Sequence, residues 1–156
     1  MKIADVVCAK AILPELCSVK RDDVIAELVE ALDKAGVLGN GNSAAISKAV
    51  IIRENEASTG IGKGVAVPHV KHELIKEAIA AIGISSGGID FSSLDKQPVY
   101  TVVLLLSPID GDQHWLAMEA IFSHLQNDDF RKFLRQSKTS EDICELLLEV
   151  DENPTL

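Results

Sequence analysis

Apolar residues recur at helical spacing in two segments near the start of the chain. The first covers residues 22–35, where Asp22 and Asp23 could cap a helix and Gly36 would end it. The second runs from about Ser43 to Glu56, with Asn42 or Ser43 as its cap. The apolar faces of the two predicted helices consist of Val24, Leu28, Ala31, Leu32 and Ala35 in the first, and of Ile46, Ala49 and Val50 in the second. Arg53 follows these residues on the same face of the second helix, so a cationic side chain continues the apolar stripe.

The last third of the chain shows helical spacing three more times. It predicts helices over Gln113 to Gln126, Asp128 to Arg135 and Ser140 to Val150. The last of these begins with a sequence typical of a capping box, Thr139 to Asp142. Its buried stripe would be Ile143, Leu146, Leu147 and Val150.

Short apolar runs bounded by turn residues predict the strands. Ala80 to Ser85 and Tyr100 to Ser107 are the strongest candidates, and Val65 to Val67 is a shorter one. Near the N-terminus, Ile12 and Leu13 before Pro14, followed by Leu16 to Val19, could supply another strand, although Pro14 cannot donate to a central ladder.

This order of elements favours an α/β fold. The strongest strands are apolar on both faces, which is typical of a sheet covered by helices on both sides. We therefore expect one domain over residues 1–156, a three-layer α/β/α sandwich with helices flanking a mixed sheet. No internal repeat and no linker rich in Pro, Gly or Ser divides the chain.

Composition excludes several classes of protein. The formal charge is −9, from 15 basic and 24 acidic residues, and no basic cluster typical of nucleic-acid binding is present. No apolar run could span a bilayer, and the N-terminus lacks a signal peptide, so we expect a cytoplasmic protein that is not embedded in a membrane. Cys8, Cys17 and Cys144 are irregularly spaced, which argues against a disulfide framework or a cysteine zinc site.

The chemistry is concentrated between Arg53 and His69. Glycines at 60, 62 and 64 permit backbone conformations in which several N–H groups face one point, a common way to hold phosphate oxygens. The spacing matches neither a Walker loop nor G-x-G-x-x-G. His69 follows Pro68, which restricts the chain that presents it. A neutral imidazole is a nucleophile near pH 7 and forms a P–N bond that is readily transferred.

At this point the sequence resembles a known family. An Arg-Glu pair at 53 and 54, Ser-Thr-Gly-Ile-Gly at 58–62 and Gly-Val-Ala-Val-Pro-His at 64–69 are similar to the active-site signature of the type-2 IIA proteins of the bacterial phosphotransferase system. That group includes fructose, mannitol and nitrogen-regulatory members. Gly-Ile-Asp-Phe at 88–91, the strand ending at Pro108 and His114-Trp-Leu-Ala follow in the expected order, so the resemblance covers nearly the whole chain. One departure is Val70, where many relatives have a small residue such as Gly.

The resemblance implies roles for three side chains and a mannitol-type IIA fold. His69 would accept the phosphoryl group. His114, at the first turn of its helix where the dipole disfavours protonation, would orient His69 or the phosphate through a hydrogen bond. Arg53 would stabilise the phosphoryl group. The alternatives are a structural core histidine at 114 and a surface salt bridge from Arg53 to Glu54 or Glu56.

Two further assignments follow from the same segment. Ser58 and Thr59 could donate hydroxyl hydrogens to the phosphate, although Ser-Thr-Gly is also ordinary turn chemistry. His69 and His72 form an H-x-x-H pair that could bind a metal on a helix together with His114, but the glutamate of H-E-x-x-H is missing, so we expect no metal and no cofactor.

The resemblance implies a phosphohistidine carrier, a component of a transferase. His69 would take its phosphoryl group from a small HPr-like protein and pass it to a IIB domain. The alternative is a nitrogen-type regulatory protein that binds target proteins according to its phosphorylation state. The same residues would serve both functions, so the sequence leaves transport and regulation open.

Overall fold

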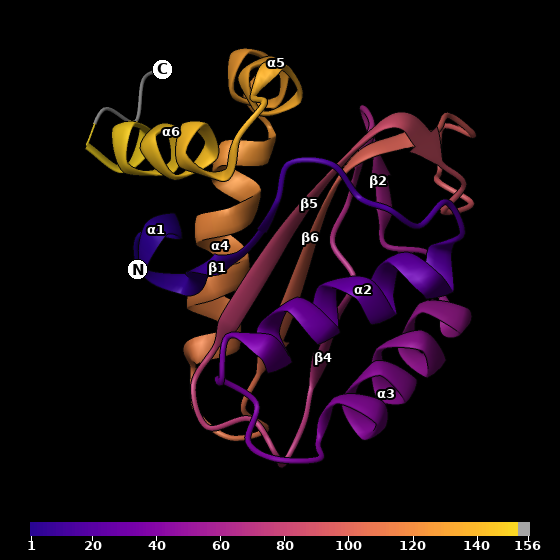
Figure 1. The fold of residues 1–156 in the computed structure, drawn as a ribbon, viewed down its shortest axis with the longest axis vertical. Coiled ribbons are helices and arrows are strands. Elements are labelled where there is room, and N and C mark those ends of the chain that lie inside the picture. Colours follow the sequence, from indigo (N-terminus) through magenta and orange to yellow (C-terminus); the bar gives the residue numbers. More distant parts are fainter. Residues whose placement is uncertain (153–156) are drawn as a thin grey trace.

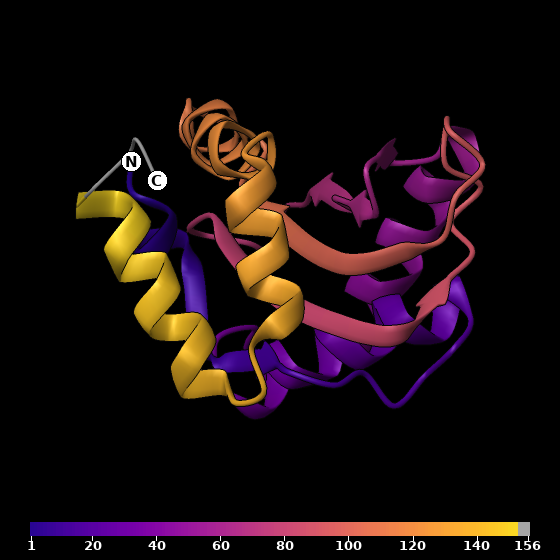
Figure 2. The same cartoon turned by 90° about the horizontal axis from the view of Figure 1, so that it is seen from above.

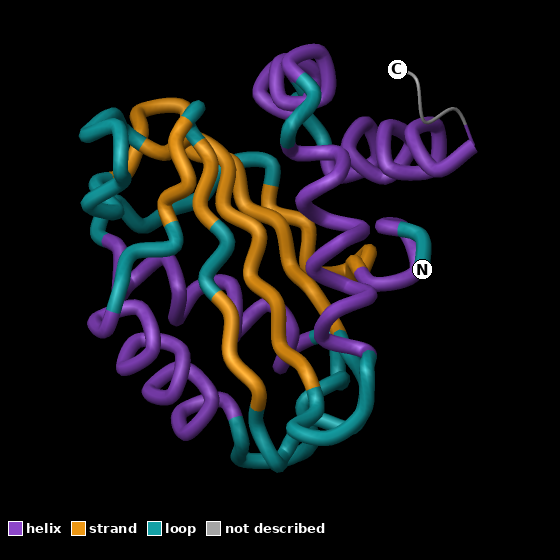
Figure 3. Tube along the Cα trace, turned by 180° about the vertical axis from the view of Figure 1, so that it is seen from behind, coloured by secondary structure: helices purple, strands orange, loops and turns teal. Residues whose placement is uncertain are grey.

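The structure, a computed structural model, describes residues 1–152, and residues 153–156 of the predicted domain lie outside it. Its centre is a mixed sheet of six strands (Figures 1 and 3). The strands are β1 (Val7–Leu13), β2 (Gly60–Gly62), β3 (Val65–Ala66), β4 (His69–Lys71), β5 (Ile79–Ile89) and β6 (Val99–Ser107). They lie in the order β1-β5-β6-β3-β2, and β4 also pairs with β6.

The strands of the sheet run in mixed directions, and the longest pairing joins β5 and β6. β5 and β6 are antiparallel and paired from Ile79 opposite Leu106 to Ile89 opposite Val99. β1 runs parallel to β5, and both β3 and β4 run parallel to β6. The long strand β6 therefore pairs with β5 along one edge and with the short strands β3 and β4 along the other.

Helices cover both faces of this sheet, as Figure 2 shows from above. The helices are α1 (Ile3–Val6), α2 (Arg21–Lys34), α3 (Ser43–Glu56), α4 (Gln113–Leu125), α5 (Asp128–Gln136) and α6 (Ser140–Glu152). α2 and α3 contribute to one hydrophobic core, and the other four helices contribute to the second. Along β6, Val103 and Leu105 belong to one core and Leu104 and Leu106 to the other, as the alternation of a strand requires. The predicted three-layer architecture is confirmed.

The predicted helices are confirmed, with two corrections at their starts. α2 begins at Arg21, so Asp22 and Asp23 lie in its first turn and do not cap it, although their charge suits that end of the dipole. α3 has Asn42 at its N-cap, but the Asn42 side chain donates to the Leu38 carbonyl and makes no capping bond. At α6, Thr139 Oγ1 accepts from the Asp142 N–H at 3.1 Å, while the Asp142 carboxylate accepts from Lys138.

The strands differ more from their predictions. β1 begins at Val7, earlier than expected, and no strand forms over Leu16 to Val19, where the Leu16 N–H donates to the Ile84 carbonyl. β5 continues past Ser85 to Ile89 through an irregularity in its pairing with β6. β2 and β4 have three residues each and were not predicted. They depend on neighbouring strands rather than on a local apolar pattern.

The first and last helices are tied together. The Asp151 carboxylate on α6 accepts the N–H groups of Ile3 at 3.0 Å and Ala4 at 2.9 Å. His124 on α4 lies 3.7 Å from the same carboxylate. Asp151 therefore satisfies the free amides at the start of α1 and joins three helices.

Within residues 1–152, no helix has both the length and the apolar character that crossing a membrane requires.

Candidate functional site

His69 is the first residue of β4 and lies opposite Leu105 of β6. The preceding residue, Pro68, accepts a backbone hydrogen bond from the Leu105 N–H at 3.0 Å, which fixes the chain next to the imidazole. Val70 follows in the same strand, paired with Leu106, and packs against the core under α2 and α3. The backbone after His69 is thus held as a strand, and Val70 fits it as a partly buried side chain.

The ring of His69 has a defined tautomer. Its Nδ1 lies 2.7 Å from the Val67 carbonyl oxygen, and because a carbonyl only accepts, Nδ1 carries the hydrogen. The lone pair of the neutral ring is then on Nε2. Burial lowers the pKa of His69 below its ordinary value of 6.5, and the positive charge of Arg53 acts in the same direction, against the Val67 carbonyl and Glu54. His69 is therefore a neutral imidazole at pH 7 with Nε2 as its nucleophilic atom.

His114 lies beside it, in the first turn of α4, as the sequence predicted. The centroids of the two rings are 5.6 Å apart and their planes make an angle of 42°. His114 Nδ1 lies 2.9 Å from the Ser107 hydroxyl at the end of β6, which fixes the orientation of the ring. Burial lowers the pKa of His114 below its ordinary value, and repulsion by the Lys71 charge and by a protonated His69 ring acts in the same direction. Both rings are thus neutral.

Arg53 approaches from the last turn of α3. Its Nη1 donates to the Ala57 carbonyl at 3.0 Å, and its charge acts on His69. A cation is favoured at this end of a helix. Within residues 1–152 Arg53 forms no ion pair with a carboxylate, including those of Glu54 and Glu56. Its remaining guanidinium hydrogens are available to an anion near His69.

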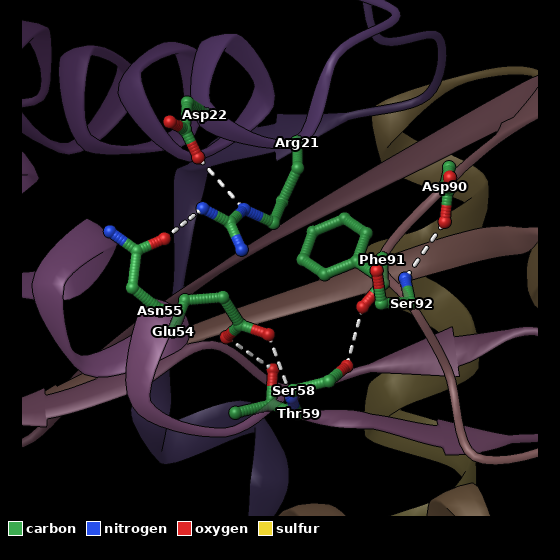
Figure 4. Close-up of polar contacts among 9 residues, drawn as sticks. All are labelled: Arg21, Asp22, Glu54, Asn55, Ser58, Thr59, Asp90, Phe91 and Ser92. Carbon is green, nitrogen blue, oxygen red and sulfur yellow. Dashed lines mark hydrogen bonds and ion pairs between the residues drawn. The ribbon is translucent and has the colours of Figure 1, made fainter.

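The buried stripe of α3 differs from its prediction. It consists of Ile46, Val50 and Glu54, whereas Ala49 and Arg53 are only partly buried. Glu54 is 2% exposed, and its two carboxylate oxygens accept the N–H and the hydroxyl of Thr59, each at 2.7 Å (Figure 4). A buried carboxylate needs such partners. Glu54 therefore anchors the loop that follows α3.

Backbone hydrogen bonds connect the anchored loop to His69. The Thr59 carbonyl accepts from the Val67 N–H at 3.1 Å, and the Val67 carbonyl accepts from His69 Nδ1. Glu54, Thr59, Val67 and His69 thus form one chain of hydrogen bonds. Sequence reasoning missed the role of Glu54, Val67 and Ser107; the Arg-Glu pair in the motif was the only signal for Glu54.

The hydroxyls of Ser58 and Thr59 are both used within the protein. Ser58 donates to the Phe91 carbonyl, as Figure 4 shows, and its oxygen accepts from the Gly60 N–H at 3.0 Å. Thr59 donates to Glu54. The predicted donation of these hydroxyls to a phosphate would require these bonds to break. In this structure the bonds of Ser58 and Thr59 hold the glycine loop, the segment that contains Gly60, Gly62 and Gly64.

The H-x-x-H pair does not lie on a helix. His69 belongs to a strand, and His72 Nδ1 accepts from the Leu74 N–H at 3.1 Å in the following turn. Among residues 1–152, no three His, Cys, Asp or Glu side chains are grouped so that they could hold a metal ion.

A comparison with protein families shows which family has this sequence. Residues 9–150 match the family described as phosphoenolpyruvate-dependent sugar phosphotransferase system, EIIA 2. The chain belongs to this family. The predicted family is therefore confirmed. Membership of this family makes the chain a phosphotransferase component.

Curated relatives of the EIIA 2 chain fall into two groups. The fructose-specific EIIABC component of Bacillus subtilis (strain 168) is 32% identical over 97% of this chain, which spans only 24% of that protein. The nitrogen regulatory protein of Bradyrhizobium diazoefficiens is 34% identical over 94% of this chain and 95% of its own length. Sequence similarity thus extends to both transport and regulatory proteins.

Solved structures confirm the fold class. The nitrogen regulatory protein IIA-Ntr from Neisseria meningitidis has a TM-score of 0.82 and 23% identity, over 93% of this chain and 98% of that one. The mannitol IIA protein of Escherichia coli, in its complex with phosphorylated IIB, has a TM-score of 0.77 and 16% identity, over 91% of this chain and 96% of that one.

Proposed function

We propose that His69 of this EIIA 2 chain accepts a phosphoryl group on Nε2 and passes it to a second protein. The observation that carries the proposal is the hydrogen bond from His69 Nδ1 to the Val67 carbonyl, which leaves Nε2 as the free nitrogen. The neutral ring, the adjacent His114 and the charge of Arg53 support it.

The reaction needs no proton transfer. The P–N bond of a phosphohistidine on the donor breaks as the P–Nε2 bond forms, and the electron pair of the broken bond returns to the donor ring. His69 keeps its Nδ1 hydrogen, and the Val67 carbonyl dipole stabilises the positive charge that develops on the ring. Arg53 stabilises the charge on the equatorial oxygens, while His114, fixed by Ser107, orients the phosphoryl group.

The donor in this proposal is a small HPr-like protein, and the acceptor is a IIB domain. The fold shared with the mannitol IIA protein found in complex with phosphorylated IIB supports the second assignment. Trp115, which follows His114 in the chain, is 73% exposed, and Ile109 in the loop before α4 is 55% exposed. In this proposal the two apolar side chains contact the partner protein, as tryptophans often do at interfaces.

A regulatory function is the second candidate. The Bradyrhizobium relative, which this chain matches over nearly its whole length, is a nitrogen regulatory protein. In this case the phosphoryl group on His69 would change the affinity for a target protein and would not be passed on.

The test is incubation with a phosphorylated HPr-like donor. We expect acid-labile phosphate on the wild-type protein, none on His69→Ala, and normal labelling of His72→Ala as the matched control. Absence of label on folded wild-type protein would contradict the proposal. Adding IIB proteins then separates the two functions, since a carrier loses its label to IIB and a regulatory protein retains it.

A further inference from the structure

A second concave site lies at the end of the sheet away from His69. This cleft of about 950 Å³ is bounded by the loop after β1, the last part of β5, the turn between β2 and β3, and α5 with the loop that follows it. Figure 1 labels β1, β2, β5 and α5. His69 is level with Ala80 of β5, because both pair with Leu105, whereas Ser86 lines the cleft. Six residues of strand separate these positions by roughly 20 Å. The cleft is therefore not part of the histidine site.

The cleft gathers positive charge in an acidic protein. Five cationic side chains line it, whereas the whole chain has 15 Lys and Arg and a net charge of −9. These are Lys63, Arg131, Lys132, Arg135 and Lys138. The carboxylates in the lining are those of Glu15 and Asp128. A concave surface lined by one sign of charge concentrates its field on a bound counter-ion.

Both carboxylates already have partners. Glu15 accepts from the Ser86 N–H at 3.1 Å and from the Ser86 hydroxyl. Asp128 pairs with Arg131. In the part of the chain that the structure describes, Lys63, Lys132, Arg135 and Lys138 form no ion pair. These four side chains are therefore not held by a carboxylate of the protein.

Arg135 is held in place without a carboxylate. Its guanidinium carbon lies 3.8 Å from the centroid of the Tyr100 ring. Tyr100 in turn packs against the backbone of Gly64, where a Cβ would meet the ring at 3.2 Å. Stacking fixes the plane of a guanidinium and leaves the N–H groups at its edge free for an anion. Arg135 is thus pre-organised for binding.

We propose that this cleft binds a small molecule with two or more phosphate groups, through Lys132, Arg135 and Lys138. Its volume of about 950 Å³ is within the range of sites for small ligands, about 300–1,000 Å³. A chain with a net charge of −9 repels an extended polyanion such as nucleic acid, so a compact ligand that contacts only the cleft is favoured. The hydroxyls of Ser86 and Ser137 at the walls are already donated within the protein, to Glu15 and to the Phe133 carbonyl, so the cationic side chains carry the recognition.

Calorimetric titration of the full chain with tripolyphosphate, ATP and inorganic phosphate tests the proposal. We expect saturable binding of tripolyphosphate and ATP, weaker binding of phosphate, and a decline with salt. Equal affinity for the first two would show that phosphate groups alone are recognised, whereas tighter binding of ATP would add a base contact. The double variant Lys132→Gln/Lys138→Gln should weaken binding about tenfold or more, because two charge-assisted contacts are lost.

The matched control is Lys34→Gln/Lys48→Gln, which removes the same charge from exposed positions on α2 and α3 and should bind as wild type. Equal affinity of both double variants would overturn the proposal, as would absence of saturable binding to wild type. Tighter binding of a glutamate-rich peptide than of tripolyphosphate would also overturn it, in favour of an acidic protein partner. Because His69→Ala should bind normally, failure of phosphoryl transfer would leave this result intact.

Discussion

At the scale of single residues, a main-chain atom determines which ring nitrogen of His69 carries the hydrogen and which is free. The Val67 carbonyl holds Nδ1–H, and its position is set by the backbone bond from Val67 N–H to Thr59 and by Pro68. No side-chain substitution at Val67 removes this acceptor. The choice of Nε2 is therefore a property of the loop conformation, and it depends on the residues that hold the loop.

Glu54 is the side chain on which that conformation depends most. Replacing it by Leu would leave the N–H and hydroxyl of Thr59, which is 6% exposed, without their partners. We expect Glu54→Leu to lower the free energy of unfolding by about 2–4 kcal/mol, since two buried polar groups become unsatisfied. Urea denaturation measures this, and the rate of phosphate acceptance should fall as the loop loosens.

Glu56→Leu is the control for Glu54→Leu, because Glu56 lies in the same helix turn and is exposed. It should change stability by less than about 0.5 kcal/mol. Equal stability of the two variants would show that Glu54 does not anchor the loop.

At the scale of elements, the backbone of the glycine loop needs glycine for close packing as well as for its conformational freedom. A Cβ on Gly60 would lie 2.2 Å from Ser93 Oγ and 3.0 Å from Ser93 Cα. Gly60→Ala should therefore displace β2, lower stability by about 1–3 kcal/mol and slow phosphate acceptance. Denaturation and labelling by the phosphorylated donor measure the two effects.

Two further variants test whether the contact with Ser93 causes the effect of Gly60→Ala. Gly87→Ala, where a Cβ would meet nothing within 4 Å, should behave as wild type. Combining Gly60→Ala with Ser93→Gly should restore part of the loss, because the Ser93 side chain is removed. A Gly60→Ala protein as stable and active as Gly87→Ala would show that the contact is relieved without cost.

Elements with strong local patterns could be predicted from the sequence. β5, β6 and the helices from α2 to α6 were found because apolar runs and helical stripes specify them. β2 and β4 could not be found, since three residues carry no pattern and their pairing with β3 and β6 decides them. Likewise the motif suggested that Arg53, His69 and His114 act together, but the contacts of Glu54 and Ser107 arise only from packing.

At the scale of the whole molecule, the two neutral histidines make stability depend on pH. Burial lowers the pKa of His69 and His114 below 6.5 in the folded protein, whereas in the unfolded chain both return to that value. Well above pH 6.5 both histidines are deprotonated in the folded and in the unfolded state. As the pH falls below 6.5, the unfolded state binds more protons than the folded state, so the free energy of unfolding declines.

We therefore expect urea denaturation to show lower stability at about pH 5.5 than at about pH 7.5. The double variant His69→Gln/His114→Gln should show a smaller difference between the two conditions, because it lacks both groups. An unchanged difference would assign the pH dependence to other groups. Glu27, whose pKa is lowered by hydrogen bonds from Cys17 and Ser18 despite opposing burial, contributes with the same sign at lower pH.

The tie between the two ends of the fold has a consequence for synthesis on the ribosome. The amides of Ile3 and Ala4 lie 148 and 147 residues before their acceptor, Asp151. During translation these two hydrogen bonds therefore cannot form until residue 151 has left the exit tunnel. A nascent chain that ends before this residue lacks the acceptor for both amides, even after β5 and β6 have paired.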